Sequence, residues 1–130
     1  MIYLVLNLYA LLDGVCDAIL YSRKGADSFK WNEHIVLVIR RCLVGLLVLL
    51  GVQAPYPCVI TQLLCFGLSF SFFHNGAYYI TRELINGKGL LWYYWFHDSL
   101  TSTAKLEFNY FFRTLLFLIS LIWILLYLLF

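Results

Sequence analysis

Two aspartates lie one helical turn apart near the start of the chain. Asp13 and Asp17 occupy positions i and i+4 of an apolar segment, so that in a helix they share one face. A charge inside hydrocarbon is costly, and ionisable side chains in apolar segments usually face a neighbouring helix or a water-filled cavity. Two carboxylates on one face can neutralise arginines, accept protons or bind a cation, which makes this pair the first candidate for chemistry.

A histidine and an asparagine follow the longest uncharged stretch of the chain. His74 and Asn75 come directly after it, and Tyr78 and Arg82 continue the row at helical spacing from His74. Another histidine, His34, stands at the start of a different apolar segment. Because a carboxylate beside an imidazole can act as a general acid–base pair, these residues and the aspartates form a second candidate set.

The composition decides what kind of element must position these residues. The chain has 130 residues, of which 63% are hydrophobic and 12% are charged, and its mean hydropathy is +0.84. A soluble domain carries about 25% charged residues, which it needs to cover its surface. A net charge of +2 is too small for a protein that binds a phosphate backbone. These values exclude a soluble enzyme and a nucleic-acid-binding module, and they predict an integral membrane protein.

Charge-free segments give the expected spans. Residues 42–73 and 114–130 contain no Asp, Glu, Lys, Arg or His. A helix needs about 20 apolar residues to cross hydrocarbon, and only helices or closed barrels satisfy the backbone there. We expect one all-α domain, residues 1–130, folded as an integral membrane four-helix bundle. The predicted spans are residues 2–21, 33–52, 57–85 and 106–130.

An aromatic segment lies between the third and fourth predicted helices. Leu90–Phe96 reads LLWYYWF and is too short to cross a membrane. Tryptophan and tyrosine are enriched at the headgroup level, so we interpret the segment as interfacial. The alternative is a short helix that packs on the bundle.

The basic residues predict the orientation. All nine Lys and Arg residues belong to the first and third connections or to the helix halves next to them, and the second connection has none. The positive-inside rule places that side in the cytoplasm. We therefore expect both termini outside the cytoplasm.

Folding the chain at its predicted turns brings polar residues of different helices to one depth. With a rise of 1.5 Å per residue, antiparallel neighbours can be aligned by counting away from each turn. The count places Asp13 level with Arg41, and a count back from the end of the chain places Arg113 level with His74. We expect a polar pocket in the cytoplasmic half of the bundle.

The predicted pocket assigns roles to its residues. We expect ion pairs between the two aspartates, Asp13 and Asp17, and the two arginines, Arg40 and Arg41. The catalytic candidates, if the chain is an enzyme, are Asp17, His34 and His74. The ligand-binding candidates are Asp13, Asn75, Tyr78, Arg82 and Arg113. Arginine, histidine, tyrosine and asparagine side chains at an interface suit the phosphate of a lipid headgroup.

Simpler interpretations stay open. The aspartates would need no ligand if they only neutralise the two arginines, and Arg113 can snorkel to the headgroups. A divalent metal is a further alternative, because zinc and iron accept Asp and His ligands. The nearby arginines repel a cation, and no Glu-x-x-His motif is present, so the sequence leaves the cofactor unknown.

Three polar strings carry a resemblance. They are Lys30–His34 (KWNEH), His74–Arg82 (HNGAYYITR) and Asp98–Lys105 (DSLTSTAK), together with Asp17-Ala18 and Arg23–Ala26. With them the chain resembles small, functionally uncharacterised multi-span membrane proteins of phages and prophages of gut bacteria. The resemblance implies a bacterial inner membrane and a role during infection, but no activity.

Three functions compete at this point. The first is a membrane protein whose pocket binds a lipid headgroup or a group of a partner protein. The second is a lipid-active hydrolase or transferase, metal-assisted or not. The third is an oligomeric pore or lysis-type protein, which we expect less because the outer helix halves are largely apolar and a pore needs polar residues along a whole helix. The expected partners are the bilayer and either further copies of the chain or a larger membrane complex, with no nucleic acid.

Overall fold

The chain folds into helices joined by short connections. The computed structural model describes residues 2–21, 31–97 and 109–129, with the side chains of residues 31–36 left out of the description. Its elements are α1 (Ile2–Tyr21), α2 (Trp31–Gly51), α3 (Tyr56–Ile85), the 3-10 helix η1 (Trp92–Phe96) and α4 (Tyr110–Leu129). The all-α prediction is confirmed. Three of the helices, α1, α3 and α4, are long and apolar enough to cross a membrane.

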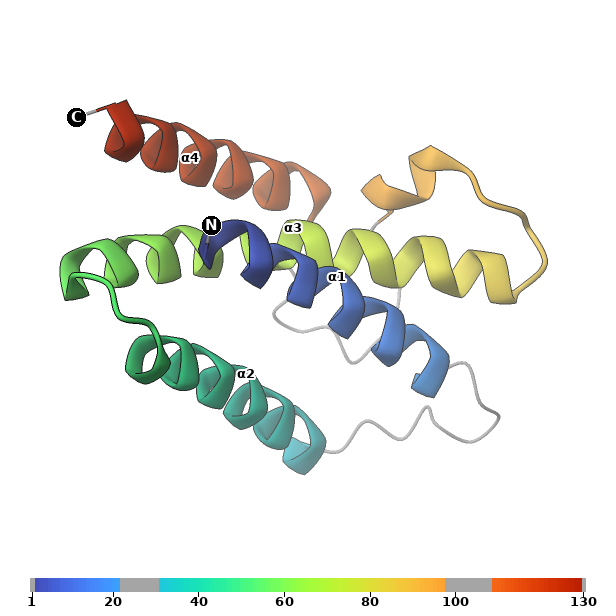
Figure 1. Ribbon diagram of the computed structural model, residues 1–130. Coiled ribbons are helices and arrows are strands. Elements are labelled where there is room, and N and C mark those ends of the chain that lie inside the picture. The colour runs from blue at the N-terminus through green and yellow to red at the C-terminus, as the bar shows by residue number, and fades with distance from the viewer. Residues whose placement is uncertain (1, 22–30, 98–108, 130) are drawn as a thin grey trace.

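The four α-helices do not pack equally. The longest helix, α3, lies at the centre, where α1, α4 and η1 pack against it (Figure 1). By contrast α2 contacts α3 at few points, and Figure 1 shows it lying apart from the other helices. Val44 and Val48 of α2 reach the apolar core formed by Leu6, Ala10 and Phe66. The arrangement is a three-helix core with a more loosely attached fourth helix.

Helix ends follow local chemistry. The backbone of α3 starts after Pro55 with Pro57 in its first turn, where a missing N–H costs nothing. Beyond its last residue the chain turns at Gly87, whose φ of 77° suits glycine. Asn109 caps α4, since its Oδ1 accepts the N–H of Phe112 at 3.0 Å. The described helix starts at Tyr110, and the predicted start of the span at residue 106 lies outside the described residues.

The aromatic segment has a packed side and an exposed side. Trp95 lies against α3, with its ring centroid 5.5 Å from that of Phe72. Its indole fills the space beside Gly76, where a Cβ would meet ring carbons at 2.2 Å. Tyr94 is buried, whereas Trp92 is 75% exposed. The segment is thus a short helix packed on the bundle, the alternative considered for it, and its outer face stays free of described contacts with α3.

Polar side chains also link the helices far from the aspartates. Ser69 donates a hydrogen bond to Asn7 Oδ1 at 2.7 Å, and the Tyr3 N–H donates to Gln62 Oε1 at 3.1 Å. The hydroxyls of Tyr3 and Ser120 lie 2.8 Å apart and tie α1 to α4. Interhelical hydrogen bonds in membranes average about 0.6 kcal/mol each. The outer halves of the helices, which we expected to be largely apolar, therefore also contain a buried network of polar side chains. In the sequence these residues stand singly among apolar neighbours.

A glycine lets α1 and α3 touch backbone to backbone. A Cβ built on Gly14 would lie 2.2 Å from the carbonyl oxygen of His74. No real side chain tolerates that distance, and a backbone carbonyl cannot rotate away. The contact therefore fixes the two flanking aspartates of α1 beside the histidine of α3.

We predict that Gly14→Ala pushes α1 away from α3 and lowers the free energy of unfolding by at least about 1–3 kcal/mol, as overpacking does. Thermal unfolding in detergent, followed by circular dichroism, measures the change. The matched control is Gly67→Ala, also within a helix, where a Cβ has nothing within 4 Å. It should be neutral or stabilising by up to about 1 kcal/mol through helix propensity. Equal melting temperatures for the two variants would show that the backbone contact does not exist.

Candidate functional site

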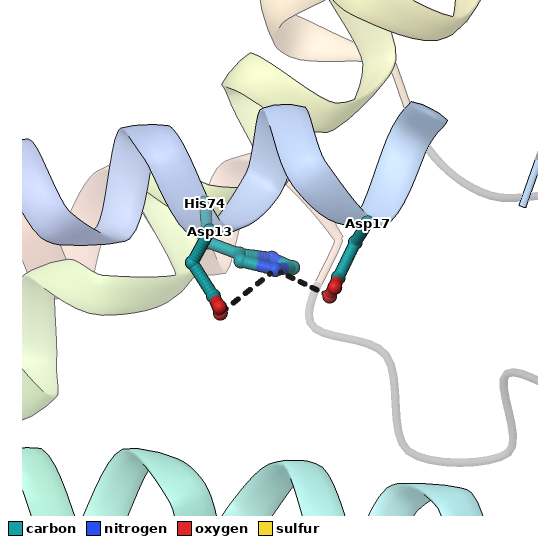
Figure 2. A group of neighbouring side chains, drawn as sticks. All are labelled: Asp13, Asp17 and His74. Atoms are coloured by element: carbon teal, nitrogen blue, oxygen red, sulfur yellow. Dashed lines mark hydrogen bonds and ion pairs between the residues drawn. The ribbon is translucent and has the colours of Figure 1, made fainter. Parts of the chain in front are cut away.

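Three helices bring charged residues to one buried place. We call Asp13, Asp17, Arg40, Arg41 and His74 the Asp–Arg–His cluster. The aspartates come from α1, the arginines from α2 and the histidine from α3. Figure 2 shows the two carboxylates on either side of the imidazole ring. In the described part of the chain, this is where buried acidic and basic side chains meet.

The predicted ion pairs are present. Arg41 Nη2 lies 2.8 Å from Asp13 Oδ2 and 3.1 Å from Asp17 Oδ2, so one guanidinium joins both carboxylates. Arg40 pairs with the other oxygen of Asp13. The side chains of Asp13 and Asp17 are only 3% and 5% exposed. Two negative and two positive charges cancel, so that no buried carboxylate is left uncompensated.

The histidine is held from both ends of its ring. Nδ1 lies 2.9 Å from Asn75 Oδ1, and Nε2 lies 3.0 Å from Asp17 Oδ2 and 2.9 Å from Arg41 Nη2. Phe70 stacks on the ring at a centroid distance of 5.1 Å, and the Arg41 guanidinium lies 4.8 Å from the same phenyl centroid. The imidazole therefore sits in a fixed orientation at the meeting point of α1, α2 and α3.

Other predicted pocket residues lie elsewhere. Tyr78 and Arg82 lie one and two turns beyond His74, about 6 and 12 Å from it along the axis of α3. Arg113 is buried, and its guanidinium carbon lies 5.6 Å from the Tyr79 ring centroid. The side chain of His34 lies outside the described residues.

The position of Arg113 corrects the depth count. It donates a hydrogen bond to the carbonyl oxygen of His97 at 2.7 Å and packs on Tyr79, about 7 Å along α3 from the predicted level of His74. The count assumed parallel axes, whereas α4 is inclined to α3 (Figure 1). Arg113 is only 2% exposed, so its side chain does not extend out of the bundle as that of a snorkelling arginine would.

Two contributors to the site were missed in the sequence. Gly14 sets the approach of the helices, and Phe70 supplies the surface on which the imidazole and the guanidinium rest. A signal existed for the glycine, because it stands between two aspartates on the face that must meet another helix. Nothing distinguishes Phe70 from the other phenylalanines of its segment.

The donor atoms of the cluster satisfy the spacing of a metal site, but their partners do not favour one. One ligand atom each from Asp13, Asp17 and His74 lies within 4.8 Å of the others. Arg41 already bonds both carboxylates, and its charge would repel a divalent cation at the same oxygens. The cluster is neutral as it stands. A metal would have to drive Arg41 out before it could bind.

The acid–base alternative gains little from the geometry. Both ring nitrogens of His74 are engaged, and their described polar partners are carboxylates, Arg41 and Asn75. No hydroxyl or thiol nucleophile is among these partners. A histidine that activates a nucleophile has to lie within hydrogen-bond reach of it.

Comparison of the chain with known protein families, with curated proteins and with solved structures gives no match. The function therefore has to be argued from the cluster and its surroundings.

We predict that Asp13→Ala lowers the free energy of unfolding by about 3–5 kcal/mol, because Arg40 and Arg41 lose their shared carboxylate. Melting in detergent measures it. The control is Glu83→Gln, which breaks an ion pair to Lys88, whose side chain is 58% exposed. The Glu83 side chain is 14% exposed, but its partner stays in contact with solvent, so this pair should contribute close to the ~0–1 kcal/mol of exposed pairs. Similar small losses in both variants would mean that water reaches the Asp–Arg–His cluster.

Proposed function

We propose that the chain is an integral membrane protein of a bacterial inner membrane, with four spanning helices and both termini outside the cytoplasm. Three helices of sufficient length and hydropathy support this, as does the exposure of large apolar side chains over every α-helix. Examples are Leu4 and Leu12 on α1, Leu47 and Leu50 on α2, and Leu128 and Leu129 on α4. Lipid covers such side chains without cost, whereas water does not. The bacterial membrane rests on the resemblance to phage and prophage proteins.

The outer face of η1 fits the same arrangement. Trp92, Tyr93 and Phe96 of η1 are exposed, a few residues after the basic Lys88. Aromatic side chains at this position suit the headgroup level of the bilayer. In the proposed orientation η1 lies on the cytoplasmic surface and marks the boundary of the membrane.

The orientation predicts that Lys88 and Pro55 lie on opposite sides of the membrane. Single cysteines at these positions, in a variant that lacks the four native cysteines, should react with a membrane-impermeant maleimide from opposite sides of intact cells or oriented vesicles. Pro55→Cys should label from outside and Lys88→Cys only after permeabilisation. Labelling of both from one side would exclude the four-span topology.

We further propose that the Asp–Arg–His cluster binds the phosphate of an anionic lipid headgroup through Arg40. The observation that carries this proposal is the difference in exposure within one ion pair: the Arg40 side chain is 45% exposed, whereas that of Asp13 is 3% exposed. The neighbours of Arg40 at Ile39 and Leu43 are exposed apolar residues of the kind that face lipid. Arg40 is thus a cation at the lipid-facing surface of α2.

The chemistry of the guanidinium favours a phosphate. Asp13 accepts from Nη2 of Arg40, and Tyr9 also interacts with this guanidinium, which carries more N–H donors than these two partners use. Phosphate oxygens accept such donors in pairs, which gives both strength and orientation. Arg40 is close to the middle of α2, and its side chain stays 45% exposed while it pairs with Asp13, so a headgroup phosphate would have to approach it there. A lipid phosphate drawn toward it would complete its hydrogen bonds.

Neither competing function is favoured by an observation of its own. The enzymatic alternative lacks a nucleophile next to His74 among the described residues. The polar residues of the α1–α3 interface, which a pore would need, bond to one another: Asn7 accepts from Ser69, and Gln62 accepts from Tyr3. Polar side chains that are hydrogen-bonded to one another across a helix interface do not line a water-filled channel.

The lipid proposal predicts that Arg40→Lys weakens the retention of phosphatidylglycerol, because lysine keeps the charge that Asp13 needs but loses the paired donors. Native mass spectrometry of the protein released from nanodiscs measures the retained lipid, and we expect about a tenfold loss of affinity, equal to 1.4 kcal/mol. The melting temperature should stay close to that of the unmodified chain.

The control is Lys88→Gln, which removes an exposed charge outside the helices and should leave lipid retention unchanged. Equal retention by Arg40→Lys and the unmodified chain would exclude the headgroup site. A changed oligomeric mass or a lost co-purifying protein, with lipid retention unaltered, would show that Arg40 instead binds a group of another protein.

A further inference from the structure

One nitrogen of the cluster has two neighbours that it cannot satisfy together. His74 Nε2 lies 2.9 Å from Arg41 Nη2, which is always a donor, and 3.0 Å from Asp17 Oδ2, which is an acceptor. Without a proton, Nε2 accepts from Arg41 and its lone pair faces the oxygen of Asp17. With a proton, Nε2 donates to Asp17 and its N–H faces the donor of Arg41. Each state satisfies one contact and opposes the other.

The hydrogen bond at the other ring nitrogen, Nδ1, decides which nitrogen of the neutral His74 ring carries the proton. Asn75 Nδ2 donates to Ser71 Oγ at 3.3 Å, which leaves Asn75 Oδ1 as the acceptor for His74 Nδ1–H at 2.9 Å. With Nδ1 protonated, the neutral imidazole has its lone pair on Nε2. A second proton can then be added only at Nε2, between Arg41 and Asp17.

The helix that carries Arg41 is the one least held by packing. Compared with α1 and α4, α2 contacts α3 at few points, and most of its length between Val38 and Leu50 is half-buried or exposed. The Arg40 and Arg41 ion pairs and the apolar contacts of Val44 and Val48 connect it to the core. A change in the charge of the cluster therefore acts on the element with the weakest other attachments.

We propose that His74 Nε2 is a proton-binding site, and that its protonation displaces Arg41 from Asp17 and loosens α2 from the three-helix core. A hydronium ion of the solvent gives up the proton: its O–H bond breaks, the N–H bond at Nε2 forms, and water is left. The new N–H then donates to Asp17 Oδ2, and no other covalent bond changes. The charge of the cluster rises from zero to +1, and three cations share two carboxylates. The proposal does not depend on a bound lipid.

The charged groups that contact His74 come from α1 and α2. From α1 they are the carboxylates of Asp13 and Asp17, at 3.6 and 3.0 Å from Nε2. From α2 they are Arg41, in contact, and Arg40, which shares Asp13. On α3 its neighbours in contact are Asn75 and Phe70, which carry no charge. Beyond them Arg113 of α4 lies beside Tyr79, and His97 follows η1. The aspartates favour the protonated ring, whereas the arginines oppose it.

The two states predict that α2 moves away from the core as the pH is lowered from about 8 to about 5. Spin labels at Leu47 of α2 and Leu118 of α4, in a variant without native cysteines and reconstituted in nanodiscs, report the distance between α2 and the core. We expect a longer distance whose population rises about tenfold from pH 8 to pH 5, as for a minor state that becomes favoured. A second pair, Leu12 of α1 and Leu118, should keep one distance at every pH.

Three histidine variants identify the group that binds the proton. His74→Gln keeps a polar side chain that does not titrate, and the α2 distance should then no longer depend on pH. His34→Gln and His97→Gln are matched controls and should keep the full dependence. A pH-independent α2 distance in the unmodified chain would overturn the proposal, and so would loss of the dependence in either control instead of in His74→Gln.

A measurement without substitution covers the case in which His74→Gln fails to fold. Nitrogen-15 spectra of the histidine-labelled protein in nanodiscs distinguish a ring protonated only at Nδ1 from a doubly protonated ring. His74 should change from the first to the second as the pH falls from 8 to 5. One unchanged protonation state over this range would exclude the proton site, whether or not Arg40 binds lipid.

Discussion

Two carboxylates buried between helices have to be neutralised, and the arrangement of the chain follows from this requirement. Asp13 and Asp17 are almost fully removed from solvent, which is tolerable only with cations in contact. The cations come from α2, and so a helix with few apolar contacts is held against the core. The two arginines balance the two carboxylates, so the proton proposed for His74 would give the cluster a positive charge that no carboxylate balances.

The charge network depends in turn on an uncharged contact. Because Gly14 has no side chain, α1 and α3 meet at their backbones, and the aspartates on either side of this glycine come within reach of His74. Trp95 uses Gly76 in the same way on another face of α3. Small residues thus set the positions of the helices, and polar residues then fix which side chains meet.

The sequence predicts those parts of the structure that follow from the length of its apolar segments and from regular helix geometry. Helix number, the turn at Pro55 and the pairing of Asp13 with Arg41 follow from apolar segments and a rise per residue. Arg113 was placed too near His74, because a count along parallel axes ignores the tilt of α4. The contact of Asn7 with Ser69 was not foreseen, since their partners depend on which helix faces are in contact. The membrane orientation and the ligand of Arg40 remain proposals.

The order of the charged helices along the chain also matters for how the protein is made. The acids stand on α1 and the arginines on α2, two helices that leave the ribosome one after the other. On insertion scales a single charge at mid-membrane costs about 2.5–3.5 kcal/mol. In the proposed membrane protein, α1 and α2 entering as a hairpin bring opposite charges together before α3 is synthesised. The pairing of opposite charges lowers the cost of inserting both helices. His74 is added later, with α3, when both carboxylates are already paired with arginines.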